Sequence, residues 1–141
     1  DFKQRAAFTV VSVKADGHCF FRAIAKAFSQ ESMHSNLRTE AVNTAMLSQN
    51  AELIDAAWEA RMRGNAWADE FVVVATAKTL GVCIEVYKQR YDEKSEDIPK
   101  PEKPVYFARY RPDETKCGNT IRLLNTGGDD GVHFELLIEK P

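Results

Sequence analysis

The order in which hydrophobic patterns follow one another along the chain constrains its fold more than any other feature. Segments with apolar residues three or four positions apart, which predict helices, fall mostly before Gly81. Segments rich in β-branched and aromatic residues, which predict strands, fall mostly after it. The expected helices are Cys19–Ser29, Leu37–Gln49, Ala51–Arg63 and Trp67–Leu80, and the expected strands are Phe8–Val13, Val82–Lys88, Val105–Arg111, Thr120–Leu124 and Val132–Glu139. Helices first and most strands last predict an α+β fold with a mainly antiparallel sheet.

The segment from Trp67 to Leu80 carries two conflicting signals. Its run of apolar residues from Phe71 to Val74 favours a strand by intrinsic propensity. Its length, its acidic first turn of Asp69 and Glu70, and Gly81 as a terminator favour a helix, which we predict. Polar, glycine-rich or proline-rich stretches separate the elements and are expected to be loops or turns: Ala15–His18, Gln30–Asn36, Gln89–Pro104 and Asn125–Gly131.

The composition is that of an ordinary globular domain. With 141 residues, 44% of them hydrophobic and 28% charged, the chain can bury a core without disulfides or a structural metal. Its net charge of −2 lacks the basic excess of proteins that bind nucleic acids or anionic membranes, so we expect neither partner. No apolar run approaches the ~20 residues of a membrane span. Because the chain starts at Asp1 rather than at methionine, we expect residues 1–141 to be a single domain cut from a longer protein.

The three cysteines, Cys19, Cys83 and Cys117, do not have the pattern of a disulfide framework. Their odd number and the lack of a CxxC pair favour a reducing, intracellular setting, either the cytoplasm or, for a viral or bacterial protein, the host cytoplasm. We expect Cys83 to be buried and inert within a strand, and Cys117 to be exposed but inactive in a loop. A zinc site needs four close Cys or His ligands, and no such spacing occurs, so no metal is expected.

Cys19 has the strongest chemical context of the three cysteines, because it follows Asp-Gly-His and begins a predicted helix. Unpaired N–H groups and the helix dipole at such a position lower the pKa of a thiol. N–H groups of the turn from Asp16 to Cys19 could also form an oxyanion hole. On a helical wheel Cys19 falls on the polar side near Lys26, away from the apolar stripe of Phe20 and Ile24. The alternative is a small, inert cysteine buried under the helix start.

His133 and Glu135 could complete a catalytic site in the last predicted strand. Strand alternation places Phe134 on the apolar face and both polar residues on the other face. Two residues span about 6.7 Å along a strand. The Glu135 carboxylate could therefore accept the Nδ1–H of His133 and leave Nε2 as a base. Together with Cys19 this would be a nucleophile, a base and an acid that orients the base. The alternative is an exposed His/Glu pair, because spacing alone does not bring Cys19 to His133.

Three blocks of sequence resemble the ovarian-tumour (OTU) family of cysteine proteases. Residues Ala15–Ala25 resemble the family signature Asp-Gly-x-Cys-x-x-Arg-x-[Ile/Val]. The stretch from Ala66 to Tyr87 resembles a second block, in which a tryptophan opens a helix that runs into a core strand. Residues Gly131–Phe134 resemble a third block, which carries a histidine followed by an aromatic residue. The blocks occur in the family order and span residues 8–138.

The resemblance implies a papain-like cysteine protease fold, with a central sheet flanked by helices. It also implies hydrolysis of the isopeptide bond after the C-terminal Gly-Gly of ubiquitin or a ubiquitin-like modifier. The expected partners are ubiquitin or polyubiquitin chains, and the expected protein is a monomer without a cofactor. The resemblance assigns Cys19 as the nucleophile, His133 as the general base and acid, and the turn from Asp16 to Cys19 as the oxyanion hole.

Four roles around this site stay open. Glu135 stands where the family commonly has Asp or Asn, so the residue that orients His133 could be Glu135 or Asp16, and Asp16 could instead order its loop. Trp67 is either the wall of a channel for the Gly-Gly tail or a core tryptophan. His18 could line the cleft entrance. His34 is expected on the solvated surface.

Two other functions compete with a deubiquitinase. A non-catalytic ubiquitin-binding domain could keep the fold, although the presence of Cys19 and His133 argues against it. A cysteine acyltransferase or a peptidase with unrelated substrates could share the fold and the catalytic residues.

Overall fold

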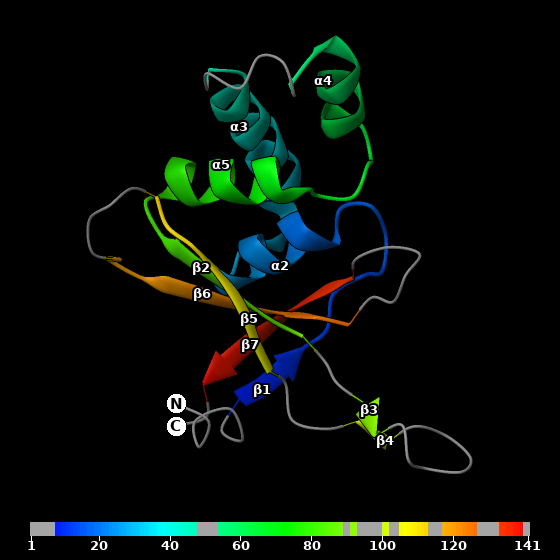
Figure 1. Cartoon of the computed structure of the whole chain (residues 1–141), viewed down its shortest axis with the longest axis vertical. Coiled ribbons are helices and arrows are strands. Elements are labelled where there is room, and N and C mark those ends of the chain that lie inside the picture. The colour runs from blue at the N-terminus through cyan, green and yellow to red at the C-terminus, as the bar shows by residue number, and fades with distance from the viewer. Residues whose placement is uncertain are drawn as a thin grey trace.

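A five-stranded sheet with helices stacked on one face forms the body of the protein (Figure 1). The computed structural model describes residues 8–47, 54–88, 91–92, 100–101, 105–112, 117–126 and 133–139. The strands are β1 (Phe8–Val11), β2 (Cys83–Lys88), β5 (Val105–Tyr110), β6 (Thr120–Asn125) and β7 (Phe134–Glu139), and a separate small sheet holds β3 (Tyr91–Asp92) and β4 (Lys100–Pro101). The helices are α2 (Cys19–Ala27), the 3₁₀ helix η1 (Glu31–Met33), α3 (His34–Met46), α4 (Ala56–Arg63) and α5 (Glu70–Leu80).

The strand order β1-β7-β6-β2-β5 places the last strand of the sequence inside the sheet. β7 pairs antiparallel with β1 and with β6, and β2 pairs antiparallel with β5. β2 and β6 are parallel. The register joins Phe8 to Glu139 and Asn125 to Phe134, so the two ends of the domain meet in one sheet. The predicted α+β class with a mainly antiparallel sheet is confirmed.

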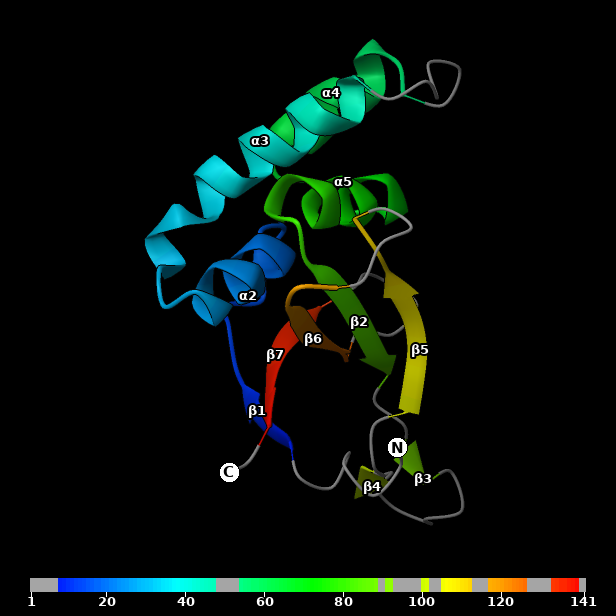
Figure 2. The same cartoon turned by 90° about the vertical axis from the view of Figure 1, so that its left-hand side faces the viewer.

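The helices form two layers over one face of the sheet (Figure 2). α2 packs against β7 and β6, and α5 packs against β2 and β5. α3 lies on α2 and α5, and α4 lies on α3. Alternation along the strands sends one set of apolar side chains into the main core beneath the helices. This set is Ile84, Val86, Ile121, Leu123, Phe134 and Leu136.

Local capping explains why the ambiguous segment is a helix. The Asp69 carboxylate accepts the Val72 N–H at 3.0 Å and so caps the first turn of α5. Its other oxygen accepts the indole N–H of buried Trp58 at 2.6 Å, which ties α4 to this helix start. Gly81 ends the helix in the left-handed conformation, with φ of 66°. The helix prediction is confirmed, but the helix begins at Glu70 rather than at Trp67.

Besides the start of α5, the largest differences from the prediction are at the starts of α3 and α4 and in the loop from Gln89 to Pro104. α3 begins at His34 after a 3₁₀ turn, inside the segment predicted as a loop. α4 begins at Ala56, because Asp55 accepts the Trp58 N–H at 2.8 Å and caps it there. β3 and β4 form a short ladder within the predicted loop from Gln89 to Pro104. Most of that loop, most of the predicted turn from Asn125 to Gly131, and residues 48–53 lie outside the described residues.

A disulfide joins Cys83 to Cys117, which corrects the expectation that these cysteines are not paired in a disulfide. Their Cα atoms lie 5.4 Å apart, and the bond links the first residue of β2 to the segment that leads into β6. Cys83 is buried, as predicted. Within the described ranges, no three His, Cys, Asp or Glu side chains are grouped as metal ligands. None of the helices in that part of the chain is long and apolar enough to cross a membrane.

Candidate active site

Cys19 begins α2 and lies deep between the sheet and the helices. Its side chain is only 1% exposed, and Sγ accepts the backbone N–H of Phe134 at 3.4 Å. The helical wheel was wrong to place Cys19 on a polar side, because α2 is covered by β7 on one side and by α3 on another. The contact with Phe134 joins the start of α2 to the start of β7, across 115 positions of sequence.

Burial raises the pKa of the Cys19 thiol above its ordinary value. The N–H groups of Phe134, Phe20 and Cys19 itself act in the opposite direction, and the nearby Asp16 carboxylate raises the pKa further. The expected lowering by the helix start is therefore outweighed by desolvation. A thiol in this position needs a base to remove its proton at neutral pH.

His133 immediately precedes β7, next to the residue whose N–H contacts Cys19. The Thr126 N–H donates to the His133 carbonyl at 2.9 Å and holds this backbone in place. Nε2 of His133 lies 3.2 Å from a Glu135 carboxylate oxygen, and both side chains are 18% exposed. His133 and Glu135 are thus mostly buried, unlike the exposed pair of the alternative interpretation.

The His133 ring is oriented opposite to the prediction. Glu135 contacts Nε2 rather than Nδ1, and Nδ1 is buried without a hydrogen-bond partner among the described residues. With Nε2 engaged, Nδ1 is the nitrogen available for proton transfer. Glu135 therefore contacts the nitrogen that the sequence prediction had left unbound.

Asp16 orders the turn before Cys19. Its carboxylate accepts the His18 N–H at 2.9 Å and receives two bonds from the Arg22 guanidinium, at 3.0 and 3.2 Å. Although burial alone would raise the pKa of Asp16, these two partners lower it below its ordinary value. Of the two roles left open for Asp16, the contacts of this carboxylate fit the ordering of the loop.

The N–H groups of this turn are mostly engaged. The Asp16 N–H donates to the Lys14 carbonyl at 3.1 Å, and the Cys19 N–H donates to the Asp16 carbonyl at 3.1 Å. The His18 N–H is held by the Asp16 side chain. The expectation of unpaired N–H groups is therefore wrong for three of the four residues from Asp16 to Cys19.

Gly17 lies against the loop that precedes α5. A Cβ atom at Gly17 would collide with the carbonyl oxygen of Asn65 and lie 2.8 Å from its carbonyl carbon. Glycine is therefore required by close backbone approach. The Gly17 carbonyl in turn accepts a bond of 2.6 Å from Arg38 of α3.

Arg38 is a neighbour of the site that the sequence interpretation missed. It is 3% exposed and reaches from α3 to the turn before Cys19. A signal for it did exist, because Arg38 shares a helical stripe with Ala41, Val42 and Ala45, which are all buried. A charged residue within an apolar stripe indicates a buried partner.

His18 and His34 pack together beside the turn. Their ring centroids lie 5.6 Å apart, and Nδ1 of His18 is buried without a hydrogen-bond partner in the described part of the chain. Burial and the charge of Arg38 lower the pKa of His18, while Asp16 partly opposes them. His34 is partly buried rather than on the solvated surface that was predicted.

The two tryptophans have different positions. Trp58 is 3% exposed and is the core tryptophan that anchors the start of α5. Trp67 lies in the loop before α5 and is 39% exposed. Trp67 is therefore not the core tryptophan of the alternative interpretation.

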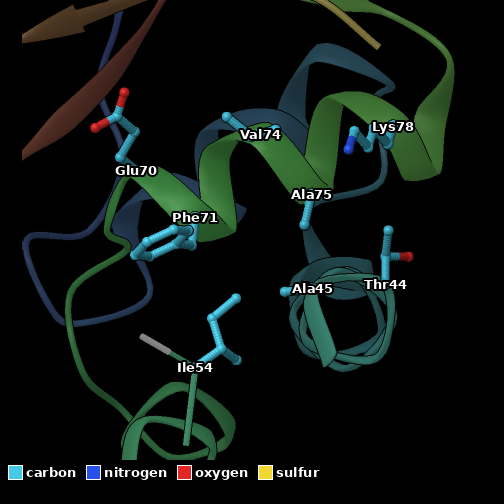
Figure 3. A pocket seen from close by; sticks show the side chains of 8 residues that line it. All are labelled: Thr44, Ala45, Ile54, Glu70, Phe71, Val74, Ala75 and Lys78. Carbon is cyan, nitrogen blue, oxygen red and sulfur yellow. The ribbon is translucent and has the colours of Figure 1, made fainter. Parts of the chain in front are cut away.

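A separate pocket lies between α3 and α5 (Figure 3). It has a volume of about 340 Å³ and includes Ala45, Ile54, Phe71 and Ala75 in its wall. None of the predicted site residues lines this pocket. The candidate site is instead the turn before Cys19, the start of α2 and the start of β7.

The comparisons with known proteins identify the family and the fold of the chain. The family described as OTU-like cysteine protease matches residues 14–134, a range that contains Cys19 and His133. The OTU domain of OTUD1 matches with a TM-score of 0.71 and 20% identity, over 99% of this chain and 91% of that chain. No curated protein sequence matches the chain.

Two further solved structures have the same fold. The OTU-domain protease of Dera Ghazi Khan virus matches with a TM-score of 0.68 and 20% identity, over 98% of this chain and 85% of that chain. An OTU deubiquitinase from Wolbachia pipientis wMel, solved bound to ubiquitin, matches with a TM-score of 0.61 and 16% identity, over 96% of this chain and 98% of that chain. Together with the family match, the expected OTU fold is confirmed, and the chain belongs to the family of OTU-like cysteine proteases.

Proposed function

We propose that this protein is a cysteine-type deubiquitinase, which hydrolyses the isopeptide bond after the C-terminal Gly-Gly of ubiquitin or a ubiquitin-like modifier. The observation that carries the proposal is the contact between Cys19 Sγ and the N–H of Phe134, the residue that follows His133, whose imidazole contacts Glu135. A nucleophile, a base and an orienting carboxylate are the groups that acyl transfer from a lysine amine requires. The fold shared with a ubiquitin-bound OTU deubiquitinase supports ubiquitin as the substrate class.

The reaction proceeds in two halves. Nδ1 of His133 accepts the thiol proton of Cys19, and the thiolate attacks the carbonyl carbon of the scissile bond. His133 then gives that proton to the lysine amine, which leaves while a thioester forms on Cys19. In the second half His133 removes a proton from water, the hydroxide attacks the thioester, and the carboxylate of the modifier leaves. The proton returns to Cys19, which restores the starting state.

The surrounding residues receive supporting roles. Glu135 holds Nε2 of His133 and stabilises the imidazolium that forms when the thiol ionises. Asp16, bound to Arg22, orders the turn rather than the imidazole. We assign Trp67 to the wall of the channel for the Gly-Gly tail, because its exposed indole stands in the loop that packs on Gly17. His18 lines the cleft entrance in this proposal.

An activity probe made of ubiquitin with an electrophile at its C terminus tests the function directly. We expect a stable adduct one ubiquitin heavier than the protein, with the bond mapped to Cys19 by mass spectrometry. Ubiquitin without the electrophile is the control and should form no covalent product. A reversible complex alone would indicate a non-catalytic ubiquitin-binding domain, and no complex at all would indicate an acyltransferase or peptidase with other substrates.

Replacing Glu135 with alanine should lower kcat/KM on a fluorogenic ubiquitin substrate by about 10-fold to 100-fold, and replacing it with glutamine should cost less. The carboxylate orients His133 through Nε2 and balances its charge, whereas glutamine keeps only the acceptor. The matched control is Glu139→Ala, because Glu139 lies on the same strand face as Glu135 and contacts Arg122 at 3.4 Å. A wild-type kcat/KM for Glu135→Ala would show that Glu135 does not orient His133.

A further inference from the structure

Arg38 is a buried cation that crosses from α3 to the turn before the nucleophile. One terminal nitrogen donates to the Gly17 carbonyl at 2.6 Å, and the other donates to the Met62 carbonyl at 2.8 Å. The guanidinium also lies over the ring of Phe21, 4.6 Å from its centroid. Arg38 therefore joins the turn, α4 and the buried face of α2 through one side chain.

The burial of this charge is not explained by its hydrogen bonds alone. Nε of Arg38 is buried without a partner among the described residues, and both of its bonded acceptors are neutral carbonyls. Burial lowers the pKa of Arg38, while the negative charges of Asp16 and of the Cys19 thiolate raise it. The guanidinium lies against Gly17 and Phe21, each two residues from Cys19, so its positive charge stands beside the turn that carries the nucleophile.

The peptide group between Gly17 and His18 is held at both of its polar ends. Arg38 binds the carbonyl oxygen, and the Asp16 carboxylate accepts the N–H at 2.9 Å. Gly17 has no side chain to restrict its backbone, so without these contacts the peptide could rotate. A rotated carbonyl would present its negative end next to Cys19, where the reaction places an oxyanion.

We propose that Arg38 is a positioning residue of this site, which fixes the Gly17–His18 peptide and supplies positive charge where the thiolate and the oxyanion form. The effect of Arg38 on turnover rests on the proposed deubiquitinase function. The effect of Arg38 on the Cys19 thiolate does not rest on that function, because the rate of alkylation by a small electrophile measures it.

Arg38→Met and Arg38→Lys test the proposal, with Arg63→Met as the matched control. Arg63 also joins α4 to α3, through Asn43 at 2.8 Å, and it pairs with Glu59 of its own helix at 2.7 Å; among the described residues, none of its bonds goes to the turn. The measurements are kcat and KM on a fluorogenic ubiquitin substrate, the rate of alkylation of Cys19 by chloroacetamide at neutral pH, and the melting temperature. Because Cys83 and Cys117 are joined in a disulfide, alkylation without reductant reports Cys19.

For Arg38→Met we expect kcat to fall about 10-fold to 30-fold with KM within about two-fold, and alkylation to slow about three-fold to ten-fold. Arg38→Lys should restore the alkylation rate, because the charge remains. It should restore only part of kcat, because a single ammonium does not reproduce the planar fork that binds two carbonyls. Arg63→Met should lower the melting temperature and leave both rates unchanged.

If Arg38 only stabilised the fold, its replacement would change the alkylation rate of Cys19 in the opposite direction. Loosened packing would expose Cys19 and speed its alkylation, so faster or unchanged alkylation in a folded Arg38→Met protein overturns the proposal. Unchanged kcat in that variant overturns it as well. If the wild-type protein does not turn over the ubiquitin substrate, the proposed function fails, while the alkylation rates still decide the role of Arg38.

Discussion

Replacing Cys19 with alanine should abolish cleavage of ubiquitin chains while the protein stays folded. We expect a loss of at least about 10³-fold, because removal of the nucleophile leaves no second group that can form the thioester. Cys83 and Cys117 are joined to each other and do not substitute for it. The substitution removes one buried sulfur atom, which should cost about 1 kcal/mol of stability.

Chain cleavage followed on gels and thermal melting of the same samples would check this result. Cys117→Ala is the control for activity, since Cys117 lies outside the site in the segment leading into β6; it also breaks the disulfide with Cys83, so its melting temperature should fall. The control should retain most of the activity. Cleavage by Cys19→Ala above a few per cent of the wild-type rate would show that Cys19 is not the nucleophile.

Replacing Gly17 with alanine should have the second largest effect, a loss of activity of at least about 100-fold together with a lower melting temperature. The new methyl group would overlap the backbone carbonyl of Asn65, and a backbone atom cannot give way as a flexible side chain can. The turn must therefore move, and it carries both the Arg38 contact and the residue before Cys19. Displacement of a nucleophile by about 1 Å can cost 100-fold in rate.

Gly118 offers a matched control for this prediction. A Cβ at Gly118 meets no other atom within 4 Å, so Gly118→Ala should leave activity and stability near the wild-type values. The measurement is kcat/KM with thermal melting for both variants. A Gly17→Ala protein with wild-type kcat/KM would mean that the contact between the turn and Asn65 does not position Cys19.

Local signals explain why the order of the elements could be predicted from the sequence. Asp69 and Gly81 mark the two ends of α5 by chemistry that acts within one turn, and the structure has the cap and the left-handed residue at these positions. The α5 prediction succeeded against strand propensity for this reason. By contrast, the sequence contains no comparable local cap for α3, where the residue before the helix provides no side-chain bond, and its start was misplaced.

Tertiary packing explains what could not be predicted. A helical wheel for α2 shows one apolar stripe, but layers on two sides bury Cys19 and Phe21 as well. Either nitrogen of His133 could face Glu135, and the spacing of the two residues along the strand does not choose between them. The pKa of Cys19 likewise depends on how completely the sheet and helices exclude water from it. The sequence therefore predicted the contact between His133 and Glu135, but not the burial of Cys19 or the orientation of the His133 ring.

Because β7 lies between β1 and β6, the site can form only after this strand has been synthesised and has paired with both neighbours. During synthesis, α2 and Cys19 leave the ribosome long before the strand that must insert between β1 and β6. Pairing of such distant segments is a slow step of folding, because the entropy cost of closing a long loop precedes any stabilising contact. Until β7 inserts, Cys19 lacks the Phe134 contact and His133 has no fixed place. We therefore expect a nascent or stalled chain to lack the proposed activity, so that the first appearance of activity would report when the sheet has closed.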